Sequence, residues 1–335
     1  MNDLRKEFIT WLSIDEGGCD QRIDNFLCKH LKGVPKSHVY RILRSGEVRV
    51  NKKRVDHTYR LKLDDNLRIP PVRVADTQDH QYVPALEFPI LYEDDALLVI
   101  DKPSGVAVHG GSGVSFGVIE QLRQARPQAK FLELVHRLDR ETSGILLVAK
   151  KRSALKNLQD QFRERETGKT YLALVIGQWP ANKKVLDKSL HKYLLPDGER
   201  RVKVVAKDDP DGMPSLTLVK VRAAGGTATD TVANAGNASR GYSLLEVTIK
   251  TGRTHQIRVH LASEGLPIAG DDKYGDFECN KALARANSPA LLKRMFLHAW
   301  RLQCNHPVTG ARMELRADLP DELSRFLLQV LPQQH

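Results

Sequence analysis

The chain has 335 residues, enough for two domains, and its formal net charge of +11 favours a polyanionic partner. No run is long and apolar enough to span a membrane, and the first residues lack the apolar core of a secretion signal, so the sequence predicts a cytoplasmic protein with no membrane partner. The cysteines form no C-x-x-C pair, which predicts reduced thiols and argues against a disulfide framework or a zinc knuckle: Cys19, Cys28, Cys279 and Cys304.

The positive charge is concentrated near the N-terminus. Residues 21–75 contain 14 Lys or Arg and 5 Asp or Glu, a balance of +9. Helical spacing of apolar residues predicts one helix over 22–31 and a second that begins at Pro35 and ends near Gly46. A strand at 48–50, a basic turn and a strand at 67–69 should follow. This compact basic module is typical of phosphate contact, although a solvated basic face without a partner is the alternative.

The module resembles the S4 RNA-binding domain through the runs RIDNFL at 22–27 and GEVRVN at 46–51, with Ser37 and Arg41 between them. The resemblance implies that this module binds RNA. The basic side chains expected to contact RNA are Arg22, Lys36, Arg41, Arg44, Lys52 and Lys53. A proline pair at 70–71 and a polar stretch after it predict a linker. We therefore expect an S4 domain at 20–75, a linker at 76–88 and a second domain at 89–333.

The second domain contains a polar loop between two apolar runs. Residues 132–135 and 145–148 are short and mostly aliphatic, which predicts two buried strands. The loop between them places Asp139 between Arg137 and Arg140. A loop held by core strands is a rigid place for a reactive carboxylate. The alternative is an acid that only caps a turn and pairs with a neighbouring arginine.

Other patterns predict the remaining elements of this domain. Apolar runs around an acidic turn at 90–100 predict a hairpin, and the glycine-rich stretch 110–117 predicts a turn because it lacks the lysine of a phosphate-binding loop. The stretches 197–211 and 225–241 should lie at the surface, the second as a hairpin loop. The expected strands are 169–175, 216–221, 242–249 and 296–304, and the expected helices begin near Ser153 and cover 321–331.

A second polar-rich stretch, residues 251–261, is predicted to form part of a strand. It contains His255 and His260. On a strand, two residues five positions apart lie on opposite faces, so they could not bind one zinc ion together. The sequence therefore predicts no metal site.

Together these pieces resemble the RluA-type pseudouridine synthases. The matching runs are HRLDRETSG at 136–144, KTY at 169–171 and GRTHQIRVH at 252–260, with support from LYEDD at 91–95 and KPSG at 102–105. Within this family the chain is most similar to enzymes of large-subunit (23S) ribosomal RNA, through KGVPKS at 32–37, NKKR at 51–54, IPPVRV at 69–74 and HGGSG at 109–113. The resemblance implies an α+β fold in which a small S4 domain precedes a mixed, largely antiparallel sheet flanked by helices.

The resemblance also implies the chemistry, which is isomerisation of a flipped-out uridine to pseudouridine at specific sites of 23S ribosomal RNA. It makes Asp139 the catalytic carboxylate, places the guanidinium of Arg258 beside it, and expects Tyr171 to pack on the base and to help remove the C5 proton. Arg137 and Ile257 would contact the substrate. Attack of the carboxylate on C1′, attack on C6 and promotion of an elimination all remain open. The reaction involves no redox change or external group, so no cofactor is expected.

The expected partner is ribosomal RNA or a ribosome assembly intermediate, bound by a monomer. One rival function is a non-catalytic RNA-binding protein, which the joint presence of Asp139, Tyr171 and Arg258 disfavours. The other is a phosphotransferase, because His136 and Arg137 begin like a kinase catalytic loop. That loop requires Asp directly after Arg and an Asp-Phe-Gly element, and the chain has neither.

Overall fold

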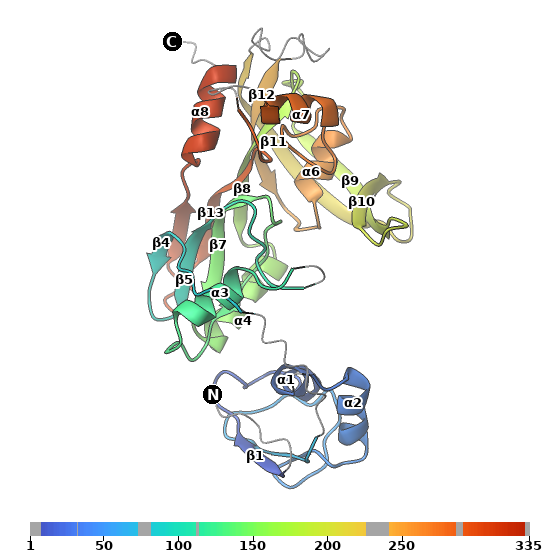
Figure 1. Cartoon of the computed structure of the whole chain (residues 1–335), viewed down its shortest axis with the longest axis vertical. Helices are drawn as coiled ribbons and strands as arrows, with labels where there is room; N and C mark the ends of the chain where they lie inside the picture. Colours follow the sequence, from blue (N-terminus) through green and yellow to red (C-terminus); the bar gives the residue numbers. More distant parts are fainter. Residues whose placement is uncertain are drawn as a thin grey trace.

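The computed structural model describes residues 8–31, 33–72, 82–111, 114–225, 241–285 and 291–331. Figure 1 shows the N-terminal module at one end of the long axis, next to the part of the larger domain that carries α3 and α4. Residues 76–81 of the expected linker lie outside the described residues.

Two helices and three short strands form the N-terminal module: α1 (Ile23–His30), α2 (Lys36–Arg44), β1 (Thr10–Ser13), β2 (Arg49–Val50) and β3 (Asn66–Ile69). The sheet order is β1-β3-β2, and both pairs are antiparallel. The predicted helices and the strands near 48–50 and 67–69 are confirmed. Gly46 follows α2 with a φ of +75°, a conformation that glycine adopts without strain. Strand β1 was not predicted, and it pairs with β3 although it lies before residue 20.

The module has its own hydrophobic core, in which the apolar faces of α1 and α2 pack against the sheet. Most of its charged residues are exposed, whereas Asp24 and Asp65 are buried. The basic side chains of α2 and of the turn after β2 are therefore available to a ligand, while aliphatic packing holds the backbone that carries them.

The larger domain is built on an eleven-stranded, mixed and mostly antiparallel sheet, which confirms the expected fold class. The main order is β10-β9-β11-β12-β8-β13-β7-β5-β4, with β14 beside β13 and β6 beside β7. Strands β7 and β13 run parallel. The strands are β4 (Ile90–Glu93), β5 (Leu97–Lys102), β6 (Glu133–Leu134), β7 (Ser143–Ala149), β8 (Gly168–Ile176), β9 (Val185–Leu194), β10 (Arg200–Val205), β11 (Met213–Gly225), β12 (Tyr242–Ile249), β13 (Leu297–Asn305) and β14 (Arg312–Arg316).

The helices pack on the sheet through separate clusters of apolar side chains. The apolar side chains of α4 pack with those of β5 and β7, and those of α3 pack in a second cluster with other side chains of the same two strands. A third and larger cluster joins β8, β12 and β13 to α6, α7 and α8. The helices are α3 (Val118–Ala125), α4 (Arg152–Arg163), α6 (Gln256–Ala262), α7 (Phe277–Arg285) and α8 (Asp321–Val330).

Most predicted elements of this domain are present, including the hairpin β4–β5, the strands β8, β12 and β13, and the helices α4 and α8. Helices α3 and α7 and strands β9, β10 and β14 were not predicted. The stretch 197–211 lies mainly at the surface, as expected, but it contains β10, in which Val202 is buried. The expected loop 225–241 connects the antiparallel neighbours β11 and β12, and its residues 226–240 lie outside the described part of the chain.

The prediction of a strand at 251–261 is wrong, because its second half forms helix α6. Apolar residues alternate at 257, 259 and 261, which imitates a half-buried strand. In the structure every residue from 256 to 261 is buried, so no exposed face exists to set a period of two. The argument from opposite faces of a strand therefore does not apply to His255 and His260.

No helix in the described ranges has both the length and the hydropathy needed to cross a bilayer.

Candidate active site

The loop that carries Asp139 is anchored at both ends and in its middle. It runs between β6 and β7, and the amide of Thr142 donates to the Asp139 carbonyl over 3.1 Å, which closes a turn. The side chain of Leu138 is buried in the core cluster under α3. The side chain of Asp139 is 27% exposed, so the carboxylate is held by the fold but open to a ligand.

Glycine is required where this loop enters β7. Gly144 has a φ of +108°, and a Cβ there would lie 2.3 Å from the carbonyl oxygen of Ala299 on β13. The neighbouring hydroxyl of Ser143 accepts a hydrogen bond from Arg294 and lies 2.8 Å from Nδ1 of His298. These contacts fix the end of the loop against β13.

A buried lysine holds the other side of the loop. Lys102 is fully buried at the end of β5, and its Nζ donates to the carbonyls of Pro103, Val106 and Arg140 over 2.7–3.0 Å. Burial lowers the pKa of Lys102 to about 7, against the attraction of the Glu141 carboxylate. Three acceptors match the three N–H bonds of an ammonium group, so this geometry fits the charged form of Lys102.

Arg258 projects from α6 and contacts three carboxylates. Its Nε and Nη2 donate to the two oxygens of Asp271 over 2.8 and 2.7 Å, a bidentate pair whose side chains are both almost fully buried. The same Nη2 reaches Asp272 over 3.1 Å. The remaining nitrogen, Nη1, lies 3.4 Å from Oδ2 of Asp139. The structure thus brings together the two positions, 119 residues apart, that were expected to meet.

The charges of this cluster stabilise one another. Burial disfavours the Arg258 charge, but the hydrogen bonds to Asp271 and the neighbouring carboxylates raise the pKa of Arg258 above its ordinary value. Burial likewise opposes ionisation of Asp271, and the Arg258 guanidinium lowers its pKa overall. Both groups are therefore charged over the neutral pH range, so a guanidinium cation lies beside Asp139 while the Asp271 carboxylate balances its charge.

Tyr171 lies on β8, where it is paired with Val247 on β12 and with Ala299 on β13. Its ring packs against two core clusters and is only partly exposed. Burial raises its pKa well above the ordinary tyrosine range, and the negative charge of Asp139 adds to the effect. The phenol is therefore neutral at physiological pH, and its ring can present an apolar surface near Asp139.

His255 and Tyr274 complete the surroundings of the carboxylate. Nε2 of His255 lies 3.9 Å from Oδ2 of Asp139, and Nδ1 lies 2.8 Å from the hydroxyl of Tyr274. The Tyr274 hydroxyl also accepts the amide of Val202 on β10. Burial lowers the pKa of His255, against the attraction of Asp139. Strand β10, at the edge of the sheet, is thereby connected to Asp139 through Tyr274 and His255.

The other residues expected at the site differ in exposure. Arg137 is exposed, beside Asp139 in the sequence. Ile257 is 5% exposed and packs in the largest core cluster, so its side chain faces the core more than the solvent.

The residues expected to bind RNA through the N-terminal module are mostly exposed. Five of them lie on the surface of α2 or of the turn after β2: Lys36, Arg41, Arg44, Lys52 and Lys53. Arg22 is different, since its guanidinium donates to both oxygens of Asp24 over 3.2 and 2.6 Å.

Neither histidine of the 251–261 stretch belongs to a metal-like cluster in the described ranges. His260 lies 2.9 Å from the hydroxyls of both Ser215 and Thr217. One group in the described residues has potential ligand atoms within 4.8 Å of one another, and it consists of His191 on β9 with Asp209 and Asp211 in the connection from the edge strand β10 to β11. Exposed acids of this kind are common without an ion, and nothing else at this edge indicates one.

Sequence reasoning missed Asp271, Tyr274 and Lys102 as parts of the site. Asp271 follows the apolar run 266–269 in a loop, and an acid that is buried there requires a cationic partner. That requirement could have connected it to an arginine. Lys102 ends an apolar strand, and the same reasoning applies to it.

Two family models and two curated relatives match this chain. The RNA pseudouridylate synthase family model matches residues 96–263, and the S4 domain model matches residues 21–67. The chain is 53% identical to ribosomal large subunit pseudouridine synthase C of Salmonella typhimurium, over 96% of each chain. It is 52% identical to the protein of the same name in Escherichia coli, over 95% of each.

Solved structures give the same result. Human RNA pseudouridylate synthase domain containing 4 superposes with a TM-score of 0.56 and 26% identity, over 72% of this chain and 92% of the human one. Human RNA pseudouridylate synthase domain containing 1 gives a TM-score of 0.54 and 26% identity, over 70% and 84%.

Proposed function

The chain belongs to the RNA pseudouridylate synthase family, and from this premise we propose that it isomerises specific uridines of large-subunit (23S) ribosomal RNA to pseudouridine. The names of the two bacterial relatives support the ribosomal target, since each covers nearly the whole chain. The observation that carries the assignment of the site is the 3.4 Å contact between Arg258 and Asp139. In this contact the fold holds the Asp139 carboxylate beside the guanidinium cation of Arg258.

The reaction breaks the N1–C1′ bond of uridine and forms a C5–C1′ bond. N1 gains a proton and C5 loses one, so atoms and electrons balance without a cofactor. In each possible route, whether the carboxylate attacks C1′, attacks C6 or promotes elimination, the ionised form of Asp139 is the reacting group. The guanidinium of Arg258 stabilises that charge and, through Asp271, is itself held in one orientation.

Tyr171 packs against the extruded base in this proposal. Its neutral phenol fits a stacking role better than the removal of the C5 proton, because the raised pKa disfavours the tyrosinate. In this proposal Arg137, which is exposed beside Asp139, contacts the RNA around the flipped uridine, and Ile257 supports the substrate site from the core.

The proposal divides the work along the chain. Residues 20–75 capture RNA, residues 76–88 connect the two parts, and residues 89–333 carry out the chemistry. The protein acts as a monomer in the cytoplasm, on ribosomal RNA or on an assembly intermediate of the large subunit.

Two measurements test the function. Pseudouridine mapping of ribosomal RNA from cells with and without the gene should reveal large-subunit uridines that are modified only in its presence. Asp139→Asn keeps the shape of the side chain but removes its charge, so we expect folded protein, retained RNA binding and no tritium release from RNA labelled at C5 of uridine. Asp208→Asn, which removes an exposed charge elsewhere, is the matched control. Near wild-type tritium release by Asp139→Asn would refute the assignment.

A further inference from the structure

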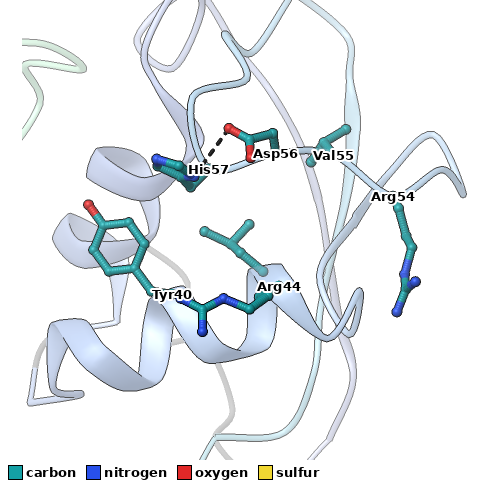
Figure 2. A pocket seen from close by; sticks show the side chains of 7 residues that line it. Tyr40, Arg44, Arg54, Val55, Asp56 and His57 are labelled. Carbon is teal, nitrogen blue, oxygen red and sulfur yellow. Dashed lines mark ion pairs between the residues drawn. The ribbon is translucent and has the colours of Figure 1, made fainter.

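The N-terminal module contains a pocket that none of the proposed catalytic residues lines. It lies between the C-terminal half of α2 and the segment 54–57 (Figure 2). Its cavity volume of about 680 Å³ is within the range of small-molecule sites. The lining residues are Tyr40, Leu43, Arg44, Arg54, Val55, Asp56 and His57.

The pocket has an apolar floor and an aromatic wall. Leu43 is buried and Val55 half-buried, and both belong to the core of the module. The rings of Tyr40 and His57 meet edge to face with centroids 5.4 Å apart. The hydroxyl of Tyr40 donates to Asp24 over 3.0 Å, which fixes the ring, while 37% of the residue stays exposed. A fixed and partly open aromatic face is suited to stacking.

Two guanidinium groups form the rim. The guanidinium of Arg44 makes no hydrogen bond or ion pair with the described part of the chain, so its charge is available. Arg54 lies across Gly46, where a Cβ would fall 1.9 Å from its Nε, and it donates to the carbonyl of Ser45. Glycine at this position therefore allows Arg54 to rest on the rim. Two cations at the mouth of an apolar pocket favour a ligand in which an anionic group is attached to a flat apolar group.

The one acid of the pocket does not prevent this. Oδ1 of Asp56 accepts the amide and the hydroxyl of Thr58 over 2.9 and 2.7 Å and lies 3.1 Å from Nδ1 of His57. Its other oxygen has no hydrogen-bond partner among the residues that the structure describes, so it can act as an acceptor. Every nucleobase has at least one N–H donor on its pairing edge, so this oxygen can bond a base without selecting one.

We propose that the pocket binds one unpaired nucleotide of the RNA, with the base against Tyr40 and its phosphate between Arg44 and Arg54. It is a second nucleotide site, separate from the site around Asp139, and it would require the RNA to be single-stranded or bulged where the module binds. The proposal rests on the RNA substrate proposed above and names what the N-terminal module recognises in it.

The test measures binding of the full chain to two probes, a ten-nucleotide single-stranded oligoadenylate and a blunt RNA duplex of ten base pairs. Tyr40→Leu removes the aromatic face, and Val55→Trp fills the cavity without changing a charge. Both variants should lower the affinity for the single strand about tenfold and the affinity for the duplex less than twofold. Tyr40→Phe, which keeps the ring but loses the hydroxyl that fixes it, should retain most of the single-strand affinity.

A matched control separates stacking from charge. Lys36→Ala removes an exposed cation of α2 that does not line the pocket. This variant should lower the affinity for both probes by the same factor. If Tyr40→Leu and Val55→Trp change neither affinity, or lower both equally, the pocket does not hold a base and the proposal is wrong.

The same proteins separate this proposal from the proposed function. If the wild type releases tritium from ribosomal RNA but Tyr40→Leu keeps its single-strand affinity, only the proposal about the pocket is wrong. A selective loss of single-strand affinity in Tyr40→Leu, without any isomerisation of ribosomal RNA by the wild type, would support the pocket and overturn the proposed substrate.

Discussion

Arg258 shows how a single side chain can be both structural and functional. Two of its nitrogens form a buried bidentate pair with Asp271, and a third faces Asp139. Removing one partner of a buried ion pair leaves the other charge unpaired and costs about 3–5 kcal/mol. The orientation of the guanidinium toward Asp139 is thus maintained by an interaction that the fold itself requires.

Different substitutions of Arg258 should therefore have different effects on the rate. Arg258→Ala should lower the single-turnover rate on the order of 100-fold, as expected for loss of a preorganised charge, and should also reduce stability. Arg258→Lys should retain part of the activity, because an ammonium keeps the charge but cannot reach Asp271 and Asp139 together in a planar fork. Single-turnover tritium release and thermal unfolding measured on both variants test this. Wild-type rates in Arg258→Ala would show that the charge beside Asp139 is not used.

At the scale of elements, the hairpin β4–β5 illustrates how one carboxylate can stabilise a turn. The Asp94 carboxylate accepts hydrogen bonds from the amides of Ala96 and Leu97 over 2.7 and 2.8 Å. It also contacts the hydroxyl of Tyr92 and Nε2 of His306. Burial opposes the charge, but these hydrogen bonds together lower the pKa of Asp94 to about 2. The acidic turn that was predicted from the sequence is therefore also a junction with the end of β13.

This pKa predicts how stability depends on pH. A carboxylate whose pKa falls from 3.8 to about 2 on folding contributes about 2 kcal/mol above pH 4, and this contribution is lost as the pH falls toward 2. Asp94→Asn should therefore lower the free energy of unfolding by about 2 kcal/mol at pH 7, and its difference from the wild type should shrink below pH 4. Urea unfolding across this pH range measures the difference. Asp95→Asn, which removes the adjacent exposed charge, is the control; an equal loss there would contradict the assignment.

At the scale of the whole molecule, charge and chemistry occupy different regions. Residues 21–75 carry +9 of the net charge of +11, whereas Asp139, Tyr171 and Arg258 lie in the larger domain. Among the described residues, two ion pairs join the N-terminal module to the larger domain, Lys29 with Glu133 over 2.5 Å and Lys156 with Asp20 over 2.8 Å. Exposed pairs of this kind contribute little to stability.

The division predicts separable effects on binding and rate. Each phosphate contact releases counterions, so neutralising Lys36, Arg41, Arg44, Lys52 and Lys53 together should weaken RNA binding and reduce the slope of log affinity against log salt by about 3–4. The single-turnover rate at saturating RNA should change much less. A salt series and single-turnover kinetics test both statements. An unchanged slope with a collapsed rate would mean that the module shapes the active site.

Catalysis should also proceed without a metal ion. The reaction needs no Lewis acid, and the carboxylate beside Arg258 supplies the charge that it requires. Activity on a short, prefolded RNA should survive treatment with a chelator of divalent ions. Activity that disappears and returns only with a stoichiometric transition metal would contradict this, whereas an effect of magnesium on RNA folding would not.

The sequence alone determined the features that depend on local patterns. Period-2 and period-3.6 spacing predicted most strands and helices, and charge counting located the basic module. The run around Asp139, with its polar loop between aliphatic strands, indicated a rigid carboxylate, and resemblance to a family connected it with Tyr171 and Arg258. These signals are local because side-chain burial, turn chemistry and motif spacing are each encoded within a few residues.

Only the tertiary structure decided which distant groups meet. The helix α6 was mistaken for a strand because a segment buried on all sides has no polar face to reveal its period. The pairing of Arg258 with Asp271, the connection from His255 through Tyr274 to β10, and the hydrogen bond from Lys102 to the Arg140 carbonyl join segments that no local pattern relates. Burial of these charges is tolerable only because the fold supplies their partners, and that compensation depends on the assembled chain.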